Sequence, residues 1–206
     1  MYASFAGNEG MPRFNHFNPE VVDYLIESAL YWLDLDGDGD FSDGIDGFRV
    51  DNATFPPQEF LNSLRQGIKS ANPEALLLGE TWVHNPSDLS RFYIDQFDAL
   101  FDFPMYEILQ GNRDSNADGM LAGKGFPVLL TSLLNDEVEK FPPEAYAVRF
   151  MSNHDTNRNA TELKGDPDRQ RMAAALLTGL PGPIMVYYGE EIGMLGQKGG
   201  APAYDN

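Results

Sequence analysis

Short, almost fully apolar runs alternate along the chain with longer segments in which apolar residues recur every three or four positions. The apolar runs are rich in β-branched, aromatic and leucine residues, which is typical of strands buried on both faces of a parallel sheet. We predict five such strands, at residues 45–50, 75–79, 99–103, 147–151 and 184–188.

The longer segments between these strands predict four helices. In the first, Asn18 is a candidate N-cap, a proline takes the first helical position, and the apolar residues form one stripe. The last begins with Asp-Pro and ends at Gly179, a typical pair of start and stop signals. The predicted helices cover residues 19–33, 57–70, 127–138 and 166–179.

The order of these elements predicts the fold class. Strands that alternate with helices form βαβ units and a parallel sheet. The strand starts are about 24 to 48 residues apart, and the polar tract 111–125 provides one long loop. This spacing is that of a TIM (β/α)8 barrel with some long loops. We therefore predict an α/β fold that forms part of such a barrel.

Composition narrows the range of partners. The 206 residues include 32 acidic and 14 basic side chains, for a net charge of −18. This excess argues against nucleic acid or an anionic membrane as the main partner, and is compatible with neutral sugars and divalent cations.

Cysteine is absent, which excludes disulfides and thiolate metal sites. No apolar run approaches the roughly 18 residues that span a bilayer, and the first residues lack the pattern of a signal peptide.

Three of the predicted strands end in an acidic residue. Asp51, Glu80 and Asp155 each follow a buried run, where a charge is costly unless it is paired or faces a cleft. Singly, each acid could cap the helix that follows. The ends of parallel barrel strands converge on one face, however, and active sites are built there. We therefore predict that the three carboxyl groups share one site.

Paired carboxyl groups suit glycoside hydrolysis. One must stay protonated to assist the leaving oxygen, and the other must stay ionised to attack the anomeric carbon. Arg49 precedes Asp51 by two positions, so both side chains leave the same face of a strand. The guanidinium would keep Asp51 ionised and oriented.

Five short motifs occur in one order along the chain. They are Met-Pro-Arg-Phe-Asn at 11–15, Gly-Phe-Arg-Val-Asp at 47–51, Gly-Glu-Thr-Trp at 79–82, Asn-His-Asp at 153–155, and Tyr-Gly-Glu-Glu-Ile-Gly-Met at 188–194. In this order and spacing they resemble the α-amylase family of glycoside hydrolases. The first resembles the motif that closes the inserted domain after the third strand, and the others resemble the fourth, fifth, seventh and eighth strands.

The resemblance covers nearly the whole chain and implies a domain division. Residues 1–18 would be the end of the inserted domain, and residues 19–206 the C-terminal part of the catalytic (β/α)8 barrel, strands four to eight with their helices. The family's third-strand motif, its first two strands and its C-terminal β-domain have no counterpart here. Five strands cannot close an eight-stranded barrel, so we expect the chain to be a piece that is inactive alone.

The resemblance also implies a mechanism and a substrate. The family's enzymes are retaining hydrolases of α-1,4-glucans such as starch and maltodextrins. Asp51 would be the nucleophile, and Glu80 the general acid and then the general base. Asp155 would hold sugar hydroxyls and favour the distorted ring.

Further residues of these motifs are candidates for binding the substrate. Arg49 would support Asp51, and His154 would donate to a hydroxyl of a bound glucose. Trp82 and Tyr188 could stack on sugar rings, or they could pack in the core instead.

Two departures bear on specificity within the family. The segment after Asp51 reads Asn-Ala-Thr-Phe, where many α-amylases carry a Lys-His pair that contacts the leaving-group sugars. Arg13 resembles the basic residue of neopullulanase-like and cyclomaltodextrinase-like enzymes. A cyclomaltodextrinase, a neopullulanase and an α-glucosidase therefore remain alternatives. A non-catalytic amylase-like binding subunit is another, but such proteins usually lose a catalytic acid. Location and oligomeric state stay open.

An acidic loop between the first helix and the first strand has the opening pattern of an EF-hand. Carboxylates at this density suit Ca²⁺, although a solvated acidic turn is the simpler alternative. A second run at 114–119 opens in the same way but has no acid at its twelfth position. The predicted calcium ligands are Asp34, Asp36, Asp38, Asp40 and Asp43.

Overall fold

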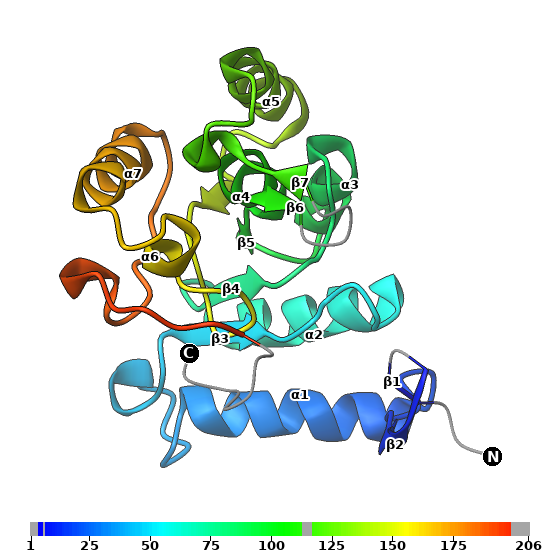
Figure 1. Ribbon diagram of the computed structural model, residues 1–206. Coiled ribbons are helices and arrows are strands. Elements are labelled where there is room, and N and C mark those ends of the chain that lie inside the picture. The colour runs from blue at the N-terminus through cyan, green and yellow to red at the C-terminus, as the bar shows by residue number, and fades with distance from the viewer. Residues whose placement is uncertain (1–3, 6, 113–116, 199–206) are drawn as a thin grey trace. The chain divides into compact units, whose positions relative to one another are not determined.

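A computed structural model describes residues 4–5, 7–112 and 117–198 of the chain (Figure 1). The chain forms two compact units, each with its own packing. The first contains Met1–Trp82 and Arg91–Leu100, and the second contains Val83–Ser90 and Phe101–Asn206. Within the described ranges, no helix is both long and apolar enough to cross a bilayer.

A four-stranded sheet confirms the predicted α/β fold. Its strand order is β3-β4-β5-β8. β3 pairs with β4 in parallel with Gly47 opposite Leu76, and β4 pairs with β5 in parallel with Leu78 opposite Ala99. The strands are shorter than the apolar runs that predict them, but each lies within its run or one residue before it. Their bounds are Gly47–Val50 for β3, Leu76–Gly79 for β4, Ala99–Phe101 for β5 and Tyr146–Val148 for β8.

The predicted strand at 184–188 is wrong as a regular strand. Ile184 forms one isolated parallel bridge with Arg149, just after β8. Two backbone hydrogen bonds make this bridge: Arg149 N donates to Pro183 O at 2.9 Å, and Met185 N donates to Arg149 O at 2.8 Å. Because the bridge does not extend into a ladder, the run keeps its apolar composition without the repeated pairing that defines a strand.

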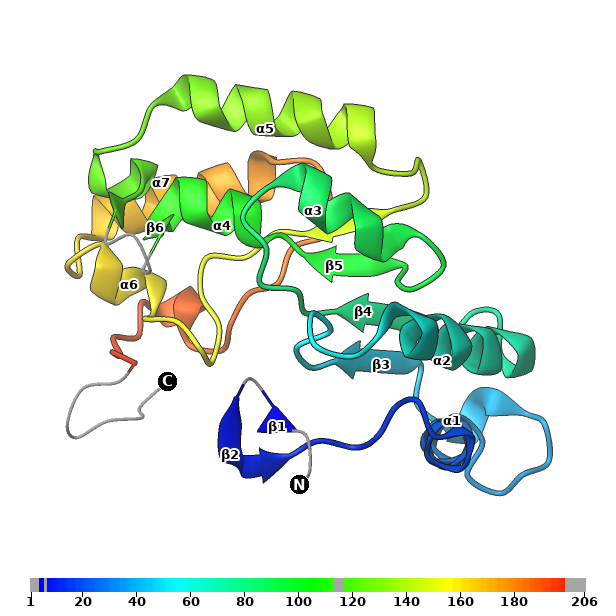
Figure 2. The same cartoon turned by 90° about the vertical axis from the view of Figure 1, so that its right-hand side faces the viewer.

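The first unit pairs two long helices. α1 (Pro19–Leu33) begins as predicted, since Asn18 Oδ1 accepts from the Glu20 N–H at 3.0 Å. α2 (Gln58–Ala71) lies beside α1 and next to β3 and β4 (Figures 1 and 2). Gly67 permits this approach, because a Cβ there would lie 2.6 Å from Ile26 Cγ2. The shorter elements of this unit are the hairpin strands β1 (Ser4–Phe5) and β2 (Asn8–Pro12) and the 3₁₀ turns η1 (Phe41–Asp43) and η2 (Arg91–Tyr93).

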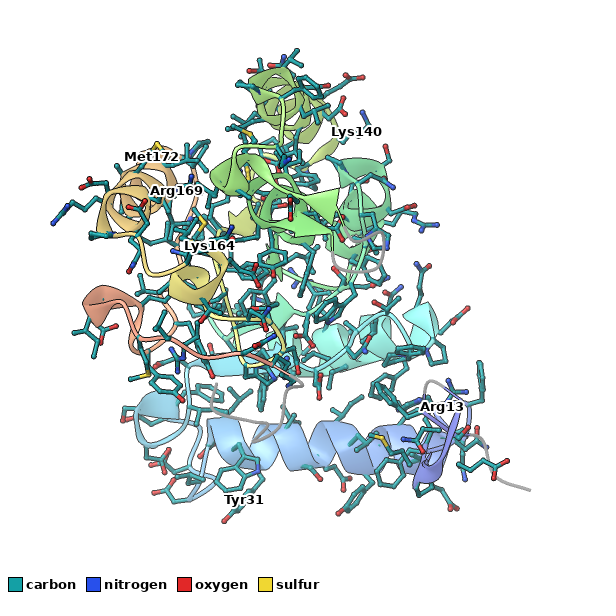
Figure 3. The ribbon with its side chains drawn as sticks, viewed as in Figure 1. Arg13, Tyr31, Lys140, Lys164, Arg169 and Met172 are labelled. Carbon is teal, nitrogen blue, oxygen red and sulfur yellow. The ribbon has the colours of Figure 1, made fainter. Side chains whose placement is uncertain are left out.

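Helices dominate the second unit, where α5 packs against α3 and α4 (Figures 1 and 2). An apolar core joins α4 and α5 to α7, whose outward side carries Arg169 and Met172 (Figure 3). The elements are α3 (Pro86–Ser90), α4 (Phe103–Gln110), β6 (Gly111–Asn112), β7 (Ala117–Asp118), η3 (Met120–Ala122), α5 (Pro127–Lys140), α6 (Asn159–Glu162), α7 (Pro167–Gly179) and η4 (Glu190–Ile192).

α4 corrects the end of the predicted strand at 99–103. The apolar run continues through Phe103, but Asp102 interrupts it as an N-cap, because its side chain accepts from the Met105 N–H at 3.0 Å. Pro104 then occupies the first helical turn, where its missing N–H costs nothing. The chain therefore changes from strand to helix inside one apolar run, and apolar composition alone does not mark that change.

A buried ion cluster ties helices of the second unit to the end of β8. Arg149 donates to both carboxylate oxygens of Glu137 on α5, at 2.8 and 2.6 Å, and also to Asp102. Its Nε donates to Pro181 O at 2.9 Å. Burial, together with the nearby charge of Glu137, raises the pKa of Asp102 to about 7 against the opposing effect of Arg149. One guanidinium thus serves two buried carboxyl groups.

Candidate active site

Three charged residues meet at the ends of two neighbouring strands in the first unit. Arg49 belongs to β3, Asp51 follows its last residue, and Glu80 follows β4. Arg49 Nη2 lies 2.7 Å from Glu80 Oε1, and Arg49 Nη1 lies 3.6 Å from Asp51 Oδ1. The two nitrogens of one guanidinium therefore hold both carboxyl groups, and the shorter contact is to Glu80 rather than to the predicted partner Asp51.

Backbone hydrogen bonds fix this arrangement. Glu80 N donates to Val50 O at 3.0 Å, and Ala53 N donates back to Glu80 O at 2.7 Å. Asn52 adopts a left-handed conformation, with φ of 39°, and its N–H donates to Glu80 Oε2 at 3.2 Å. The turn after β3 is thus pinned to the end of β4, so the separation of the two carboxyl groups is set by the sheet.

The two carboxyl groups have opposite environments. The side chain of Glu80 is 3% exposed, whereas that of Asp51 is 77% exposed. Burial raises the pKa of Glu80, a side-chain hydrogen bond with Asp51 raises it further, and Arg49 and the Asn52 N–H oppose the rise. Such a pair combines a carboxyl group whose raised pKa lets it keep a proton to higher pH than an ordinary glutamate with one that stays in contact with water, the division that acid catalysis and nucleophilic attack require.

Trp82 lies at the end of the same segment and is 41% exposed, while the intervening Thr81 is fully buried. Of the two alternatives for Trp82, this exposure favours a role at the surface over a role in the core. An indole that is partly open to solvent has the apolar area that a sugar face needs for stacking.

In the second unit, Asp155 lies in a turn that follows β8. Its N–H donates to Asn153 Oδ1 at 2.9 Å, and its Oδ2 lies 3.1 Å from His154 Nε2. Asn153 N in turn donates to Thr156 Oγ1 at 2.9 Å. The predicted pair of His154 and Asp155 is therefore in contact, and both side chains are partly exposed. The other carboxylate oxygen of Asp155 has a partner that the sequence did not indicate, Lys198 Nζ at 3.0 Å.

Tyr188 lies against Arg158. Like Lys198, Arg158 carries no signal in the sequence that marks it as a site residue. Arg158 is buried, its guanidinium carbon lies 4.6 Å from the centre of the Tyr188 ring, and its Nη1 donates to Tyr188 O at 2.5 Å. Tyr188 itself is 61% exposed, so it is not a core residue. A cation below an aromatic ring orients that ring while leaving area for a ligand.

The structure thus brings Asp51, Glu80 and Arg49 together in the first unit, and Asp155 and His154 together in the second. The convergence of all three acids on one sugar stays a prediction from the strand ends.

The acidic loop brings together three of the five predicted calcium ligands. Single carboxylate oxygens of Asp34, Asp36 and Asp43 lie within 4.8 Å of one another. Asp38 and Asp40 lie outside this group. Their carboxylates accept from the N–H groups of Asp40 and Ser42, at 2.7 and 3.0 Å. In the second acidic run, residues 114–116 lie outside the part of the chain that the structure describes.

Comparison with known protein families gives a match to the alpha amylase catalytic domain over residues 2–204. A cyclomaltodextrinase of Bacillus sp. is 30% identical over 197 residues, which are 95% of this chain and 32% of that protein. Neopullulanase 2 of Thermoactinomyces vulgaris is 32% identical over 200 residues, 95% of this chain and 31% of that protein. The chain therefore spans about a third of the length of these relatives.

Solved structures agree with the fold. The α-amylase from H. orenii superposes with a TM-score of 0.75 at 31% identity, over 93% of this chain and 38% of that one. The cyclic α-maltosyl-(1→6)-maltose hydrolase from Arthrobacter globiformis, in complex with maltose, gives a TM-score of 0.80 at 26% identity, over 96% of this chain and 42% of that one. The parallel sheet and its helices thus match part of the barrel in these enzymes.

Proposed function

The chain belongs to the α-amylase catalytic-domain family, and from this premise we propose that it supplies the catalytic carboxyl groups of a retaining glycoside hydrolase of α-1,4-glucans. The observation that carries the proposal is the shared guanidinium of Arg49, which holds an exposed Asp51 beside a buried Glu80. A double displacement needs one carboxylate that can reach the anomeric carbon and one carboxyl group that keeps a proton.

In the first step, Asp51 attacks the anomeric carbon, the glycosidic bond breaks, and the proton of Glu80 passes to the leaving oxygen. A β-linked glycosyl-enzyme results. In the second step, the Glu80 carboxylate removes a proton from water, which attacks the same carbon and releases Asp51. Two inversions give the α-anomer as the first product. Arg49 interacts with both carboxyl groups and balances their charge as the proton moves.

The remaining predicted residues would bind the glucan. Asp155 would accept hydrogen bonds from sugar hydroxyls, and His154, 3.1 Å from it, would donate one. Trp82 would offer an apolar face for a sugar ring. All three catalytic acids of the family's motifs are present, and this disfavours a non-catalytic binding subunit.

Within α-glucan hydrolases, we favour the cyclomaltodextrinase and neopullulanase type over an endo-acting α-amylase or an α-glucosidase. Arg13, which matches the basic residue of that type, lies at the end of β2 (Figure 3), and its Nη1 lies 3.4 Å from Phe55 O in the segment after Asp51. This segment lacks the Lys-His pair, and two of the similar relatives are a cyclomaltodextrinase and a neopullulanase.

To test the proposed function, the protein expressed from its complete native gene should be incubated with maltohexaose and, separately, with a cyclic maltodextrin. We expect both to be hydrolysed, the cyclic substrate at least as fast, with the α-anomer appearing first in proton NMR spectra. The β-anomer as first product would exclude a retaining mechanism. Absence of hydrolysis by folded protein would exclude the function altogether.

We also propose that the acidic loop binds Ca²⁺ through Asp34, Asp36 and Asp43. Three carboxylate oxygens within 4.8 Å of one another form a hard, dense donor set of the kind that Ca²⁺ prefers. Backbone N–H groups of Gly37 and Gly39 hold the two oxygens of Asp34, at 2.8 and 2.9 Å, and so orient this ligand. The ion would offset the mutual repulsion of the carboxylates and stabilise the loop before β3.

Removal of calcium is therefore expected to lower the Tm. At a free Ca²⁺ concentration of 100 times its Kd, binding stabilises by about 2.7 kcal/mol, so a chelator should lower the Tm by about 5 to 10 °C. Asp36→Asn/Asp43→Asn should abolish this shift, as measured by calorimetry with and without chelator. Asp38→Asn/Asp40→Asn removes the same amount of charge outside this group of ligands. This double variant should keep most of the Tm shift caused by the chelator. If both double variants lose the chelator-induced Tm shift to the same extent, the assignment of the calcium ligands is refuted.

A further inference from the structure

We propose that Lys198 is a positioning residue that holds the carboxylate of Asp155 in its working orientation. The inference rests on the proposed function, which assigns Asp155 to the binding of sugar hydroxyls. Lys198 Nζ lies 3.0 Å from Asp155 Oδ1 and donates to the backbone oxygen of His154 at 2.8 Å.

Asp155 is held from three directions. Lys198 contacts Oδ1, His154 Nε2 lies 3.1 Å from Oδ2, and the backbone N–H of Asp155 donates to Asn153 Oδ1 at 2.9 Å. One partner on each of the two oxygens of the carboxylate, an ammonium group on Oδ1 and an imidazole nitrogen on Oδ2, fixes its rotation. Because each carboxylate oxygen has two lone pairs, Asp155 can still accept a hydrogen bond from a ligand at either oxygen.

The segment that carries Lys198 is itself anchored to the turn around Asp155. Lys198 N donates to Asn157 Oδ1 at 2.7 Å, Gly196 N donates to Thr161 Oγ1 at 2.8 Å, and Arg158 N donates to Gly196 O at 3.0 Å. The red segment after η4 accordingly runs beside the yellow turn after β8 (Figures 1 and 2). These three bonds use the backbone of the segment, so they persist when the Lys198 side chain is changed.

The contact is suited to orientation rather than to stability. The side chains of Lys198 and Asp155 are 31% and 35% exposed, and ion pairs in such positions contribute little to the free energy of folding. A misplaced catalytic group, in contrast, costs much in rate. Loss of Lys198 should therefore leave the fold intact and free Asp155 to rotate away from the hydroxyls that it binds.

The test compares Lys198→Ala, Lys198→Gln and Lys198→Arg in the protein expressed from its complete native gene, with maltohexaose as substrate. We expect the Ala and Gln variants to lower kcat by about 10- to 100-fold, because the misplaced carboxylate stabilises the transition state poorly. KM should change by less than about threefold, as expected when an interaction specific to the transition state is lost. The Arg variant, which keeps a cation within reach of Asp155, should recover most of kcat.

Two controls make the test specific. Lys124→Ala removes another exposed lysine side chain in the same unit and should keep full kcat and KM. In an Asp155→Ala background, adding Lys198→Ala should lower kcat little further, because the two residues act as one. Unchanged kcat in both Lys198→Ala and Lys198→Gln, no recovery in Lys198→Arg, or additive losses in the double variant would each overturn the inference.

Failure of the proposed function gives a different result. If the wild-type protein does not hydrolyse maltohexaose, the hydrolase proposal falls and the role of Lys198 falls with it. If the wild type is active but Asp51→Asn is equally active, the assignment of Asp51 as nucleophile falls, and the site to which Lys198 is assigned falls with it. If the wild type is active, Asp51→Asn is inactive and the Lys198 variants match the wild type, only the role of Lys198 is refuted.

Discussion

Replacement of Asp51 by asparagine is expected to lower kcat on maltohexaose by at least about 10⁴-fold, the scale of losses when a nucleophile is removed. An amide cannot form the glycosyl-enzyme at a useful rate, whereas the fold should tolerate the change. Asp51 is 77% exposed and its contact with Arg49, at 3.6 Å, is long. We therefore expect unchanged thermal unfolding together with lost turnover, measured on the protein expressed from its complete native gene.

Asp46→Asn is the matched control. Asp46 is an exposed acid just before β3, so Asp46→Asn makes the same chemical change at the opposite end of the strand that Asp51 follows. It should keep kcat within about twofold, as is usual for surface changes remote from reacting groups. A second variant, Asp51→Gly with added azide and an α-glucosyl fluoride, should form the β-glucosyl azide, because azide replaces the missing carboxylate. Near-normal turnover by Asp51→Asn would remove Asp51 from the role of nucleophile.

The sequence predicts the fold best where local signals and tertiary packing agree. The bounds of α1 follow from the Asn18 cap and its apolar stripe, and α7 begins after Asp166 as its Asp-Pro start indicates. The segment 184–188 fails because its composition is that of a strand, while a strand also needs a neighbour to pair with along its length. An apolar composition indicates that a segment is buried. Whether the segment pairs as a strand depends on hydrogen-bond partners elsewhere in the chain.

The same distinction between local signals and long-range contacts applies to the candidate site. That Asp51 and Glu80 lie close together could be predicted from the sequence, because each directly follows an apolar run and the register of parallel strands brings such positions together. That Arg49 binds Glu80 more closely than Asp51 depends on pairing between β3 and β4, and no local pattern encodes it. The contact of Lys198 with Asp155 is harder still to predict, since a single lysine 43 residues after Asp155 belongs to no recognisable motif. Contacts across such separations come only from the folded chain.

Glu80→Gln is expected to lower kcat on maltohexaose by about 10²- to 10⁴-fold, the usual contribution of general acid–base catalysis. Glutamine cannot protonate the leaving oxygen. A substrate whose leaving group departs without a proton, such as an α-maltosyl fluoride, should still form the glycosyl-enzyme. The rate of that first step, measured in single-turnover experiments, should fall by about tenfold or less, since only the step that needs the acid is removed.

The pH dependence distinguishes this role from a structural one. Burial raises the pKa of Glu80, so the protonated carboxyl group that the first step needs persists to higher pH than for an ordinary glutamate. In the wild type, kcat/KM for maltohexaose should therefore fall as pH rises through this raised pKa. In Glu80→Gln that fall should vanish, because glutamine does not titrate. Glu59→Gln, on the exposed surface of α2, should keep the wild-type profile. If Glu80→Gln loses as much rate on the fluoride as on maltohexaose, the carboxyl group positions Arg49 instead of donating a proton, because loss of a purely structural contact makes no distinction between leaving groups.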